Sequence, residues 1–305
     1  MPRHALRPMP DSALVVPTVA AMQAHADAVR ARGERLAHVP TMGALHPGHL
    51  ALVRRARALA DRVVVSVFVN PTQFGPGEDY DAYPRTLDAD LAALGSLPAG
   101  ADWVFAPTAA EMYPFGLPPF ATVAVRALGD GLCGAHRPGH FDGVTSVVTK
   151  LFLACRPHVA VFGQKDAQQL ALVRRMTAEL GFGIEIDAHP IVREADGLAL
   201  SSRNRYLSAE ERAQAAVLSR GLLAAAHAAG AGERRAAALT GLVRREASGA
   251  PLVQVQYAEL VDADTLQPVE TLAKDGPSEG RYLLAVAAHV GTTRLIDNIQ
   301  IAVGD

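Results

Sequence analysis

Short runs of β-branched residues alternate with amphipathic segments along the first two thirds of the chain. Buried strands are predicted at residues 63–69, 103–105 and 159–162, with a weaker candidate at 36–39. Apolar residues recur at helical spacing between these runs, in residues 48–60, 88–94, 144–154 and 167–180. Strands that alternate with helices predict a parallel sheet with helices on both faces.

The pattern changes near residue 192. Residues 209–229 and 234–247 have helical spacing, and strands are predicted at residues 253–261, 282–288 and 295–301. We therefore expect an α/β fold with two domains. Residues 1–191 would form a doubly wound, Rossmann-like parallel sheet, and residues 192–305 a smaller α+β domain. The apolar stretch at residues 13–21 is interrupted by Pro17 and continues as an amphipathic helix, so it is interpreted as part of the fold.

Composition narrows the kind of partner. Of 305 residues, 50% are hydrophobic and 20% charged, and the formal net charge is -2, which disfavours a nucleic-acid-binding surface and favours small-molecule partners. No apolar run reaches the ~20 residues of a membrane-spanning helix, so no membrane partner is expected. The two cysteines, Cys133 and Cys155, are too few and too far apart for a disulfide scaffold, which favours a reducing cytoplasm.

Two glycine-rich motifs lack the context that their functions need. Residues 129–134 fit G-x-G-x-x-G, but Pro138 and Gly139 stand where a helix should open. Residues 276–280 fit G-x-S-x-G, but a strand follows this polar turn, whereas a nucleophilic Ser278 would need a helix there. No G-x-x-x-x-G-K-[ST] phosphate loop occurs, so a nucleotide would have to be held in another way.

The strongest local signal is His46-Pro-Gly-His49, which follows the strand candidate at residues 36–39 and a glycine-containing turn. A helix is predicted to begin near Gly48, and the N–H groups and positive dipole of a helix N-terminus attract phosphate. Imidazoles there can donate to a phosphoryl group whose charge is rearranging. Two alternatives are a structural histidine pair and a fragment of a zinc site, although the sequence places no third zinc ligand.

Six ordered blocks resemble the pantothenate synthetase family within the H-x-G-H nucleotidyltransferase group. Pro-Thr-Met-Gly-Ala-Leu-His at residues 40–46, followed by Gly48 and His49, is similar to the ATP-binding signature of that family. Similar blocks follow at residues 68–75, 83–85, 137–144, 162–169 and 201–207, with a weaker one at 293–298. Agreement of six blocks in the right order by chance is negligible.

The resemblance implies which residues bind ATP, the acid and a metal ion. It implies a magnesium ligand at Asp90, and the catalytic residues His49, His46, Lys165 and Arg203. It implies that a pantoate-like acid is bound by Gln73, Gln169, Met42, Asn70 and His140. It implies ATP contacts for Pro40, Thr41, Met42, Gly43, Ala44, Leu45, His46, Pro47, Gly48, His49, Gly163, Gln164, Lys165, Asp166, Val192, Leu200, Ser201, Ser202 and Arg203.

Several of these residues also have a simpler interpretation. Gln73 and Gln169 suit hydroxyls and a carboxylate because an amide both donates and accepts, but they could be surface glutamines. Lys165 and Asp166 suit phosphate and ribose or metal, or form a surface ion pair. Residues 201–203 are similar to the mobile Lys-Met-Ser-Lys-Ser-type loop of class I aminoacyl-tRNA synthetases; a serine-rich turn is the alternative.

Three positions depart from the family pattern. Pro47 stands between the histidines, where a polar or acidic residue is frequent, and Ala167 replaces an aromatic residue. Ala89 replaces an acidic neighbour of Asp90, which leaves an exposed helical aspartate as the alternative to a magnesium ligand there.

The resemblance also implies the reaction, an ATP-dependent condensation of (R)-pantoate with β-alanine in pantothenate and coenzyme A biosynthesis. Pantoate would attack the α-phosphorus of ATP, giving pantoyl adenylate and pyrophosphate, and β-alanine would then displace AMP. ATP and Mg2+ are the implied cofactors, a homodimer is the implied assembly, and the C-terminal domain would close over the active site. The alternatives are a plain nucleotidyltransferase and a catalytically silent nucleotide-binding protein.

Overall fold

The computed structural model describes residues 13–304, so residues 1–12 and 305 of the two predicted domains lie outside the described residues. The chain divides into two compact units. The N-terminal unit contains the described chain up to Ala124, Gly139–Gly163 and Val173–His189. The C-terminal unit contains Val125–Pro138, Gln164–Leu172 and the chain from Pro190. A single boundary after residue 191 assigns two of these C-terminal segments to the wrong unit, because their partners lie far away in sequence.

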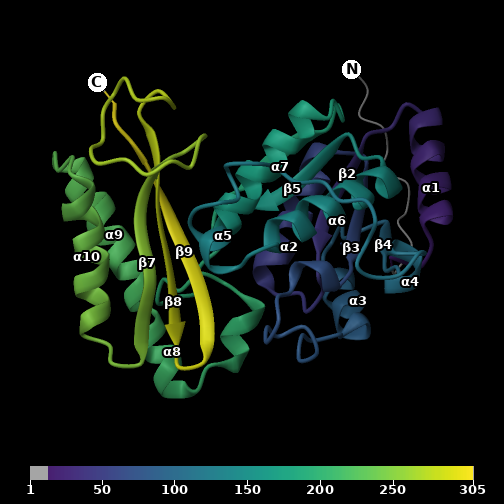
Figure 1. The fold of residues 1–305 in the computed structure, drawn as a ribbon. Coiled ribbons are helices and arrows are strands. Elements are labelled where there is room, and N and C mark those ends of the chain that lie inside the picture. Colours follow the sequence, from purple (N-terminus) through teal and green to yellow (C-terminus); the bar gives the residue numbers. More distant parts are fainter. Residues whose placement is uncertain (1–12, 305) are drawn as a thin grey trace. The chain divides into compact units, whose positions relative to one another are not determined.

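A six-stranded parallel sheet forms the centre of the N-terminal unit (Figure 1). The strand order is β1-β4-β3-β2-β5-β6. From β2 the chain adds β3 and β4 toward one edge of the sheet, and from β5 it adds β6 toward the other edge. Open α/β sheets bind ligands at such a switch point, at the carboxyl ends of the strands. The strands are β1 (Leu14–Val16), β2 (Leu36–Thr41), β3 (Arg62–Val67), β4 (Trp103–Phe105), β5 (Val159–Gly163) and β6 (Glu185–His189).

Helices cover both faces of this sheet. Val39 and Val65 pack with Val53 of α2 in one buried cluster. His38 alternates with Val39 along β2, so its ring points to the other face, where it meets Phe152 of α6 edge-on at 6.2 Å. The helices of the N-terminal unit are α1 (Val19–Ala31), α2 (Pro47–Leu59), α3 (Leu87–Gly95), α4 (Ala109–Met112) and α6 (His140–Cys155). The helix α7 (Ala167–Glu179) begins in the C-terminal unit and continues in the N-terminal unit.

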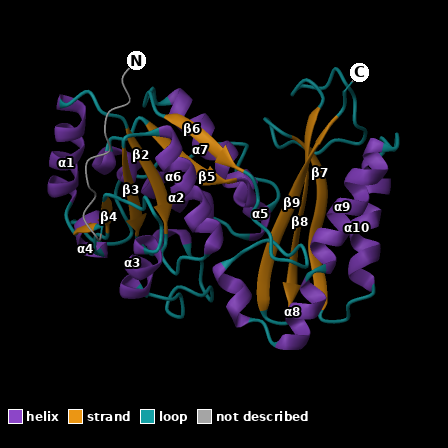
Figure 2. Cartoon of the chain, turned by 180° about the vertical axis from the view of Figure 1, so that it is seen from behind, coloured by secondary structure: helices purple, strands orange, loops and turns teal. Residues whose placement is uncertain are grey.

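The C-terminal unit has an antiparallel sheet in the order β7-β8-β9, with α9 and α10 lying along it (Figure 2). Leu222 of α9, Val243 of α10 and Leu284 of β8 are fully buried in one core cluster. The elements are α5 (Cys133–His136), α8 (Ala209–Ala215), α9 (Val217–Gly230), α10 (Ala236–Ser248), β7 (Val253–Asp262), β8 (Arg281–Val290) and β9 (Thr293–Ala302).

The predicted fold class is confirmed: a Rossmann-like parallel sheet is accompanied by a smaller α+β unit. One local prediction was wrong, and two strands were not predicted. The helix predicted over residues 209–229 is two helices, because the chain bends at Ala216, which ends α8 and precedes α9. The strands β1 and β6 were not predicted, and the residues of β1 were interpreted as part of the apolar stretch that leads into an amphipathic helix.

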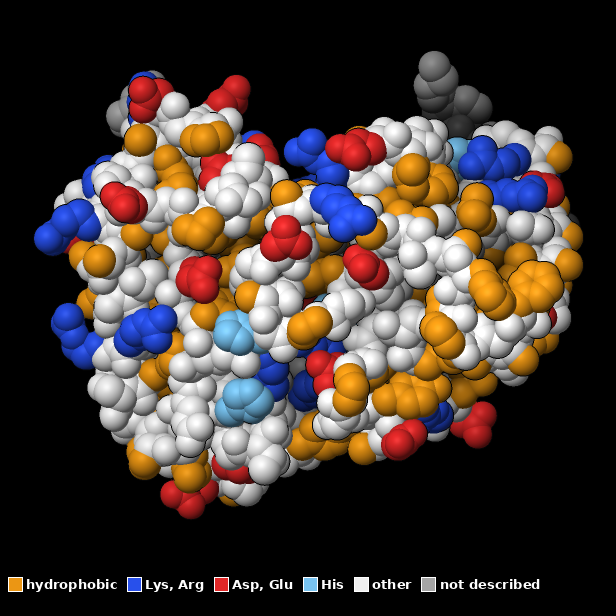
Figure 3. Space-filling model, viewed as in Figure 1, with side chains coloured by type: hydrophobic (Ala, Val, Ile, Leu, Met, Phe, Trp, Pro, Cys, Tyr) orange, Lys and Arg blue, Asp and Glu red, His pale blue; other side chains and the backbone are white. Residues whose placement is uncertain are grey.

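The surface carries both signs of charge. Basic and acidic side chains are interspersed on the face shown in Figure 3. Within residues 13–304, none of the helices combines the length and the apolar character that crossing a membrane requires.

Candidate active site

The chain turns sharply between β2 and α2. Thr41, the last residue of β2, donates its hydroxyl to the Ser66 carbonyl at 2.7 Å and accepts from the Gly43 amide at 3.1 Å. Gly43 and Ala44 then adopt positive φ angles of 84° and 51°. Such a conformation is easy for glycine but uncommon for alanine, so other contacts must hold the Ala44 backbone in place.

His46 and His49 form the N-terminal cap of α2. The His46 ring accepts the Gly48 amide at Nδ1 (3.1 Å), and the His49 ring accepts the His46 amide at Nδ1 (3.4 Å). This is the reciprocal arrangement of a capping box, and Pro47 occupies the first helical turn, where proline is favourable. The departure at Pro47 therefore has a structural reason.

These contacts assign the tautomer of both rings. Since Nδ1 accepts a backbone N–H in each ring, the neutral imidazole carries its proton on Nε2. The rings stack with centroids 4.0 Å apart. His46 thus takes up one of the backbone amides at this end of α2.

The predicted acid-binding residues of the N-terminal unit lie in one network. The Gln73 amide donates to the Met42 sulfur at 3.1 Å, and its oxygen accepts from Asn70 Nδ2 at 3.1 Å. His140, at the start of α6, lies with Nδ1 2.7 Å from the Gln73 carbonyl oxygen. The structure therefore brings Met42, Asn70, Gln73 and His140 together around η1 (Pro71–Gln73).

Within this network, Asn70 has a supporting position. Only 1% of its surface is exposed, and its amide group also donates to the Gly143 carbonyl at 3.1 Å. Its oxygen accepts from the Tyr113 hydroxyl at 2.6 Å. Asn70 is thus placed to hold Gln73, which is itself only partly buried.

Asp90 does not fit the role of a magnesium ligand. Its carboxylate is 2% exposed, and its two oxygens accept the backbone amides of Leu45 (2.7 Å) and Ala44 (3.1 Å). Among residues 13–304, no group of three or more His, Cys, Asp or Glu side chains could hold a metal ion. Both alternatives from the sequence need correction, because Asp90 is neither an open metal ligand nor an exposed helical aspartate.

Lys165 and Asp166 lie in η2 (Gln164–Asp166), which follows β5 in the chain and belongs to the C-terminal unit. The Lys165 ammonium is 3.5 Å from the Asp166 carboxylate, a loose ion pair between partly exposed side chains. The backbone is held more firmly. Asn298 of β9 donates its amide to the carbonyl oxygens of both Gln164 and Lys165 at 2.9 Å.

The two glutamines after η2 differ. Gln169 is partly exposed, as a ligand-binding side chain would be. Gln168 is 7% exposed; it donates to the carbonyls of Leu128 and Gly131 (2.9 and 2.8 Å) and accepts the Cys133 amide at 3.0 Å. Gln168 therefore fastens residues 128–133 to α7.

The predicted ATP contacts at Val192 and Leu200 pair with each other, since the Leu200 amide donates to the Val192 carbonyl at 3.0 Å. Ser201 caps η3 (Ser202–Tyr206) by accepting the Arg203 amide at 3.2 Å. Arg203 is partly exposed. Residues 192–203 thus form a short hairpin followed by a capped turn.

An ion pair between the partly buried Arg193 and the buried Asp297 anchors this hairpin. Arg193 donates to both oxygens of Asp297 on β9, at 2.7 and 3.0 Å. Burial raises the pKa of Asp297, and the Arg193 guanidinium opposes that rise. Asp297 and Asn298 were not singled out as site residues. The only signal for them was the weak sequence block at 293–298.

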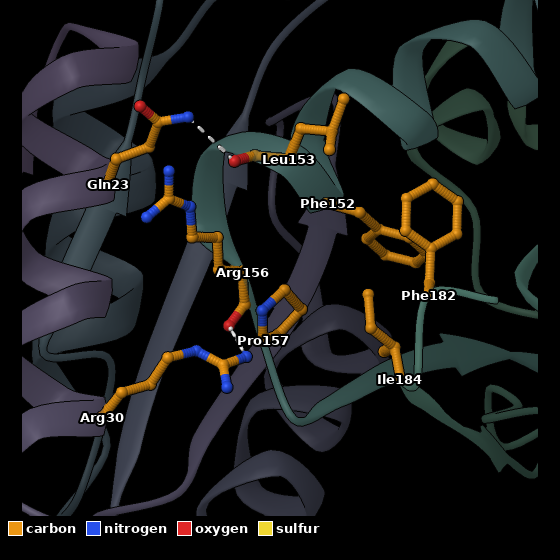
Figure 4. Close-up of a pocket in the computed structure, with 8 residues that line it drawn as sticks. All are labelled: Gln23, Arg30, Phe152, Leu153, Arg156, Pro157, Phe182 and Ile184. Carbon is orange, nitrogen blue, oxygen red and sulfur yellow. Dashed lines mark hydrogen bonds between the residues drawn. The ribbon is translucent and has the colours of Figure 1, made fainter. Parts of the chain in front are cut away.

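A separate cavity of about 420 Å³ lies elsewhere in the N-terminal unit (Figure 4). Gln23 donates to the Leu153 carbonyl (3.0 Å) and Arg30 to the Arg156 carbonyl (2.8 Å) at its edge. Its lining contains none of the predicted site residues; it consists of Gln23, Arg30, Phe152, Leu153, Arg156, Pro157, Phe182 and Ile184.

Comparison with known proteins identifies the family. The family model described as pantoate-beta-alanine ligase matches residues 14–300. The chain belongs to the pantoate-β-alanine ligase family. Pantothenate synthetase from Salinibacter ruber is 57% identical over 94% of this chain and 97% of its own length. Pantothenate synthetase from Heliobacterium modesticaldum is 54% identical over 89% of this chain and 93% of its own length.

Solved structures agree with this assignment. Pantothenate synthetase from Thermus thermophilus matches with a TM-score of 0.85 and 46% identity, over 94% of this chain and 98% of that one. The Francisella tularensis pantoate-β-alanine ligase matches with a TM-score of 0.74 and 29% identity, over 94% and 97%. The resemblance seen in the motifs is confirmed, and so is the ligase function that it implies.

Proposed function

We propose that this ligase condenses pantoate with β-alanine through a pantoyl adenylate intermediate. The observation that carries the proposal is the stacked pair of His46 and His49 at the N-terminus of α2, next to a turn whose Met42 contacts Gln73. The residues that we assign to phosphate and those that we assign to the acid are thus neighbours within the N-terminal unit.

In the first step, a pantoate carboxylate oxygen attacks the α-phosphorus of ATP, and the bond to pyrophosphate breaks. Charge moves onto the phosphoryl oxygens, and we assign His46 and His49 as donors to those oxygens. Gln73 and Gln169 are both assigned to the hydroxyl and carboxylate groups of the acid, because a side-chain amide can donate and accept hydrogen bonds. In the second step the β-alanine amine attacks the acyl carbon, and AMP leaves with the bonding electrons.

Lys165 and Arg203 are assigned to the polyphosphate. The Lys165 ammonium is a compact charge on a backbone fixed by Asn298, and the Arg203 guanidinium lies on a turn capped by Ser201. The Francisella tularensis relative was solved in complex with β-γ ATP and β-alanine, which supports ATP as co-substrate here.

Three further assignments follow the family resemblance. Magnesium would accompany ATP and be held by phosphate oxygens and water, because Asp90 does not fit as its ligand. Homodimerisation is supported by the exposed aromatic side chains of Phe115 (86%) and Phe120 (93%) in the N-terminal unit. A cytoplasmic location stays a prediction.

Isotope exchange tests the adenylate route. ATP, Mg2+ and pantoate should support exchange of labelled pyrophosphate into ATP without β-alanine, because a mixed anhydride shielded from water forms reversibly. Omitting pantoate should abolish the exchange. Exchange that requires β-alanine would contradict an adenylate formed before the amine binds, and a stable nucleotidyl product in place of AMP would indicate a plain nucleotidyltransferase.

A further inference from the structure

The Asp90 side chain belongs to α3, yet its partners lie in the turn before α2. Asp90 stands in the first turn of α3, where its own amide donates to the Thr86 carbonyl at 2.9 Å. The carboxylate is 2% exposed and accepts two amides, from Ala44 at Oδ2 (3.1 Å) and Leu45 at Oδ1 (2.7 Å). An ionised carboxylate that accepts two buried N–H groups makes strong, directional hydrogen bonds.

The turn needs such an acceptor. Gly43 and Ala44 both have positive φ angles, and this directs consecutive N–H groups away from any regular backbone partner. Asp90 supplies the partner for Ala44 and Leu45. The fit at Gly43 is tight as well, since an added Cβ there would lie 2.9 Å from Asp90 Oδ2 and 3.0 Å from Val67 Cγ1.

Residues 43–45 connect two parts of the proposed site. Met42, on one side, contacts the Gln73 amide, and His46, on the other, caps α2 and sets the tautomer of the histidine pair. Moving the turn would therefore displace an acid-binding contact and a phosphate donor together. A displacement of about 1 Å between reacting groups is enough to lower a rate about 100-fold.

We propose that Asp90 is a positioning residue that locks the Gly43–Leu45 turn, and that it is not a magnesium ligand. This inference rests on the proposed function for its effect on catalysis. A carboxylate that ligates Mg2+ must turn an oxygen toward the ion and its waters, whereas the Asp90 oxygens are directed at two backbone amides in a nearly sealed environment.

The experiment compares Asp90→Ala and Asp90→Asn with Asp88→Ala. Asp88 is an exposed carboxylate in the same first turn of α3, so its removal controls for lost charge. Three quantities are measured: turnover, the Mg2+ concentration that gives half-maximal activity, and the affinity for ATP in EDTA without metal. Imidazole 15N shifts of the histidines report the tautomers independently of catalysis.

We expect Asp90→Ala to lower turnover about 100-fold, with half-saturating Mg2+ unchanged. Metal-free ATP affinity should fall, and the 15N shifts should show that the Nε2–H tautomer is no longer uniform. Asp90→Asn should lose less turnover than Asp90→Ala, because the oxygen of the asparagine side chain can still accept one backbone amide. Asp88→Ala should match the wild type in every measurement.

A tenfold rise in half-saturating Mg2+, with turnover restored at high Mg2+ and unchanged tautomers, would overturn the proposal in favour of metal ligation. Wild-type turnover in Asp90→Ala would overturn it too. If Asp90→Ala fails to fold, Gly43→Ala tests the same turn from the other side and should show the same tautomer change. A wild-type chain that makes no pantothenate contradicts the proposed function, while the 15N shifts still decide whether Asp90 holds the turn.

Discussion

The N-terminal cap of α2 and the hairpin at residues 192–203 are held in place by contacts of different range. In the cap, His46 and His49 flank the start of the helix, and the hydrogen-bond partners are two and three residues apart. In the hairpin, Arg193 depends on Asp297, 104 positions along the chain. The Lys165 backbone likewise depends on Asn298, 133 positions away.

The difference separates what a motif specifies from what a fold supplies. A capping motif carries its own hydrogen-bond partners, so its geometry follows from a few consecutive residues. A loop that presents a lysine or an arginine needs a scaffold, and here one strand, β9, supplies it through two adjacent side chains. Mutations in the first region should therefore affect chemistry, and mutations in β9 should affect stability and nucleotide use.

The largest effect should come from Asp297→Ala. It leaves the Arg193 guanidinium partly buried without its carboxylate, a change that costs about 3–5 kcal/mol of unfolding free energy. Urea denaturation of the purified chain measures the loss. Asp264→Ala is the control, because the Asp264–Arg281 pair in the same unit is about half exposed and should contribute less than ~1 kcal/mol. Equal losses in both variants would contradict a scaffold role for β9.

Next, His49→Ala should lower turnover by ~10²- to 10³-fold, the range for removal of one donor to a developing charge. Stability should change little, since the hydrogen bond that Nδ1 of His49 accepts from the His46 amide is long (3.4 Å). Steady-state kinetics and circular dichroism measure the two quantities. His227→Ala, in an exposed position of α9, is the control. A folded His49→Ala variant with unchanged turnover would show that the histidine is structural.

The stability of the protein should depend on pH through His38, which lies on β2. Burial lowers the pKa of His38 to about 3, and its Nε2 lies 3.0 Å from the Ser66 hydroxyl. The unfolded chain binds a proton near pH 6.5 whereas the folded chain does not, so stability is lost as pH falls below 6.5. The loss should reach about 3 kcal/mol by pH 4.5.

Denaturation of the wild type and His38→Gln across this pH range isolates the contribution. Their unfolding free energies should differ in slope by about one proton, because glutamine does not titrate. Parallel pH dependences would mean that His38 is protonated in the folded state.

The smallest effect should come from Asn298→Ala. Loss of two hydrogen bonds to the η2 backbone should lower kcat/KM for ATP by about tenfold, equivalent to about 1.4 kcal/mol. The KM for β-alanine should stay unchanged. Gln300→Ala, exposed on the same strand, is the matched control. A similar loss for both co-substrates would indicate general damage to the C-terminal unit.

The sequence predicted the parts whose cause is local. Periodicity located the helix of residues 88–94 to within one residue of α3, and strand–turn–helix order located the histidine pair at the N-terminus of α2. What it missed has distant causes. Residues 125–138 and 164–172 join the C-terminal unit through contacts such as Gln168 to Leu128. The burial of Asp90 was not foreseen, because its partners, Ala44 and Leu45, lie more than forty positions earlier.

One close approach in the N-terminal unit limits which residues can be varied around Gln73, the side chain that we propose binds the acid. The helix α6 meets η1 at Gly143, where an added Cβ would lie 2.7 Å from the backbone nitrogen of Gln73 and closer still to the Thr72 carbonyl oxygen. Any library that varies position 143 would therefore push the backbone that carries Gln73, since no rotamer can avoid a clash made at Cβ. Variants intended to accept other acids should therefore change side chains such as Met42 and keep Gly143, so that the backbone at Gln73 is not displaced.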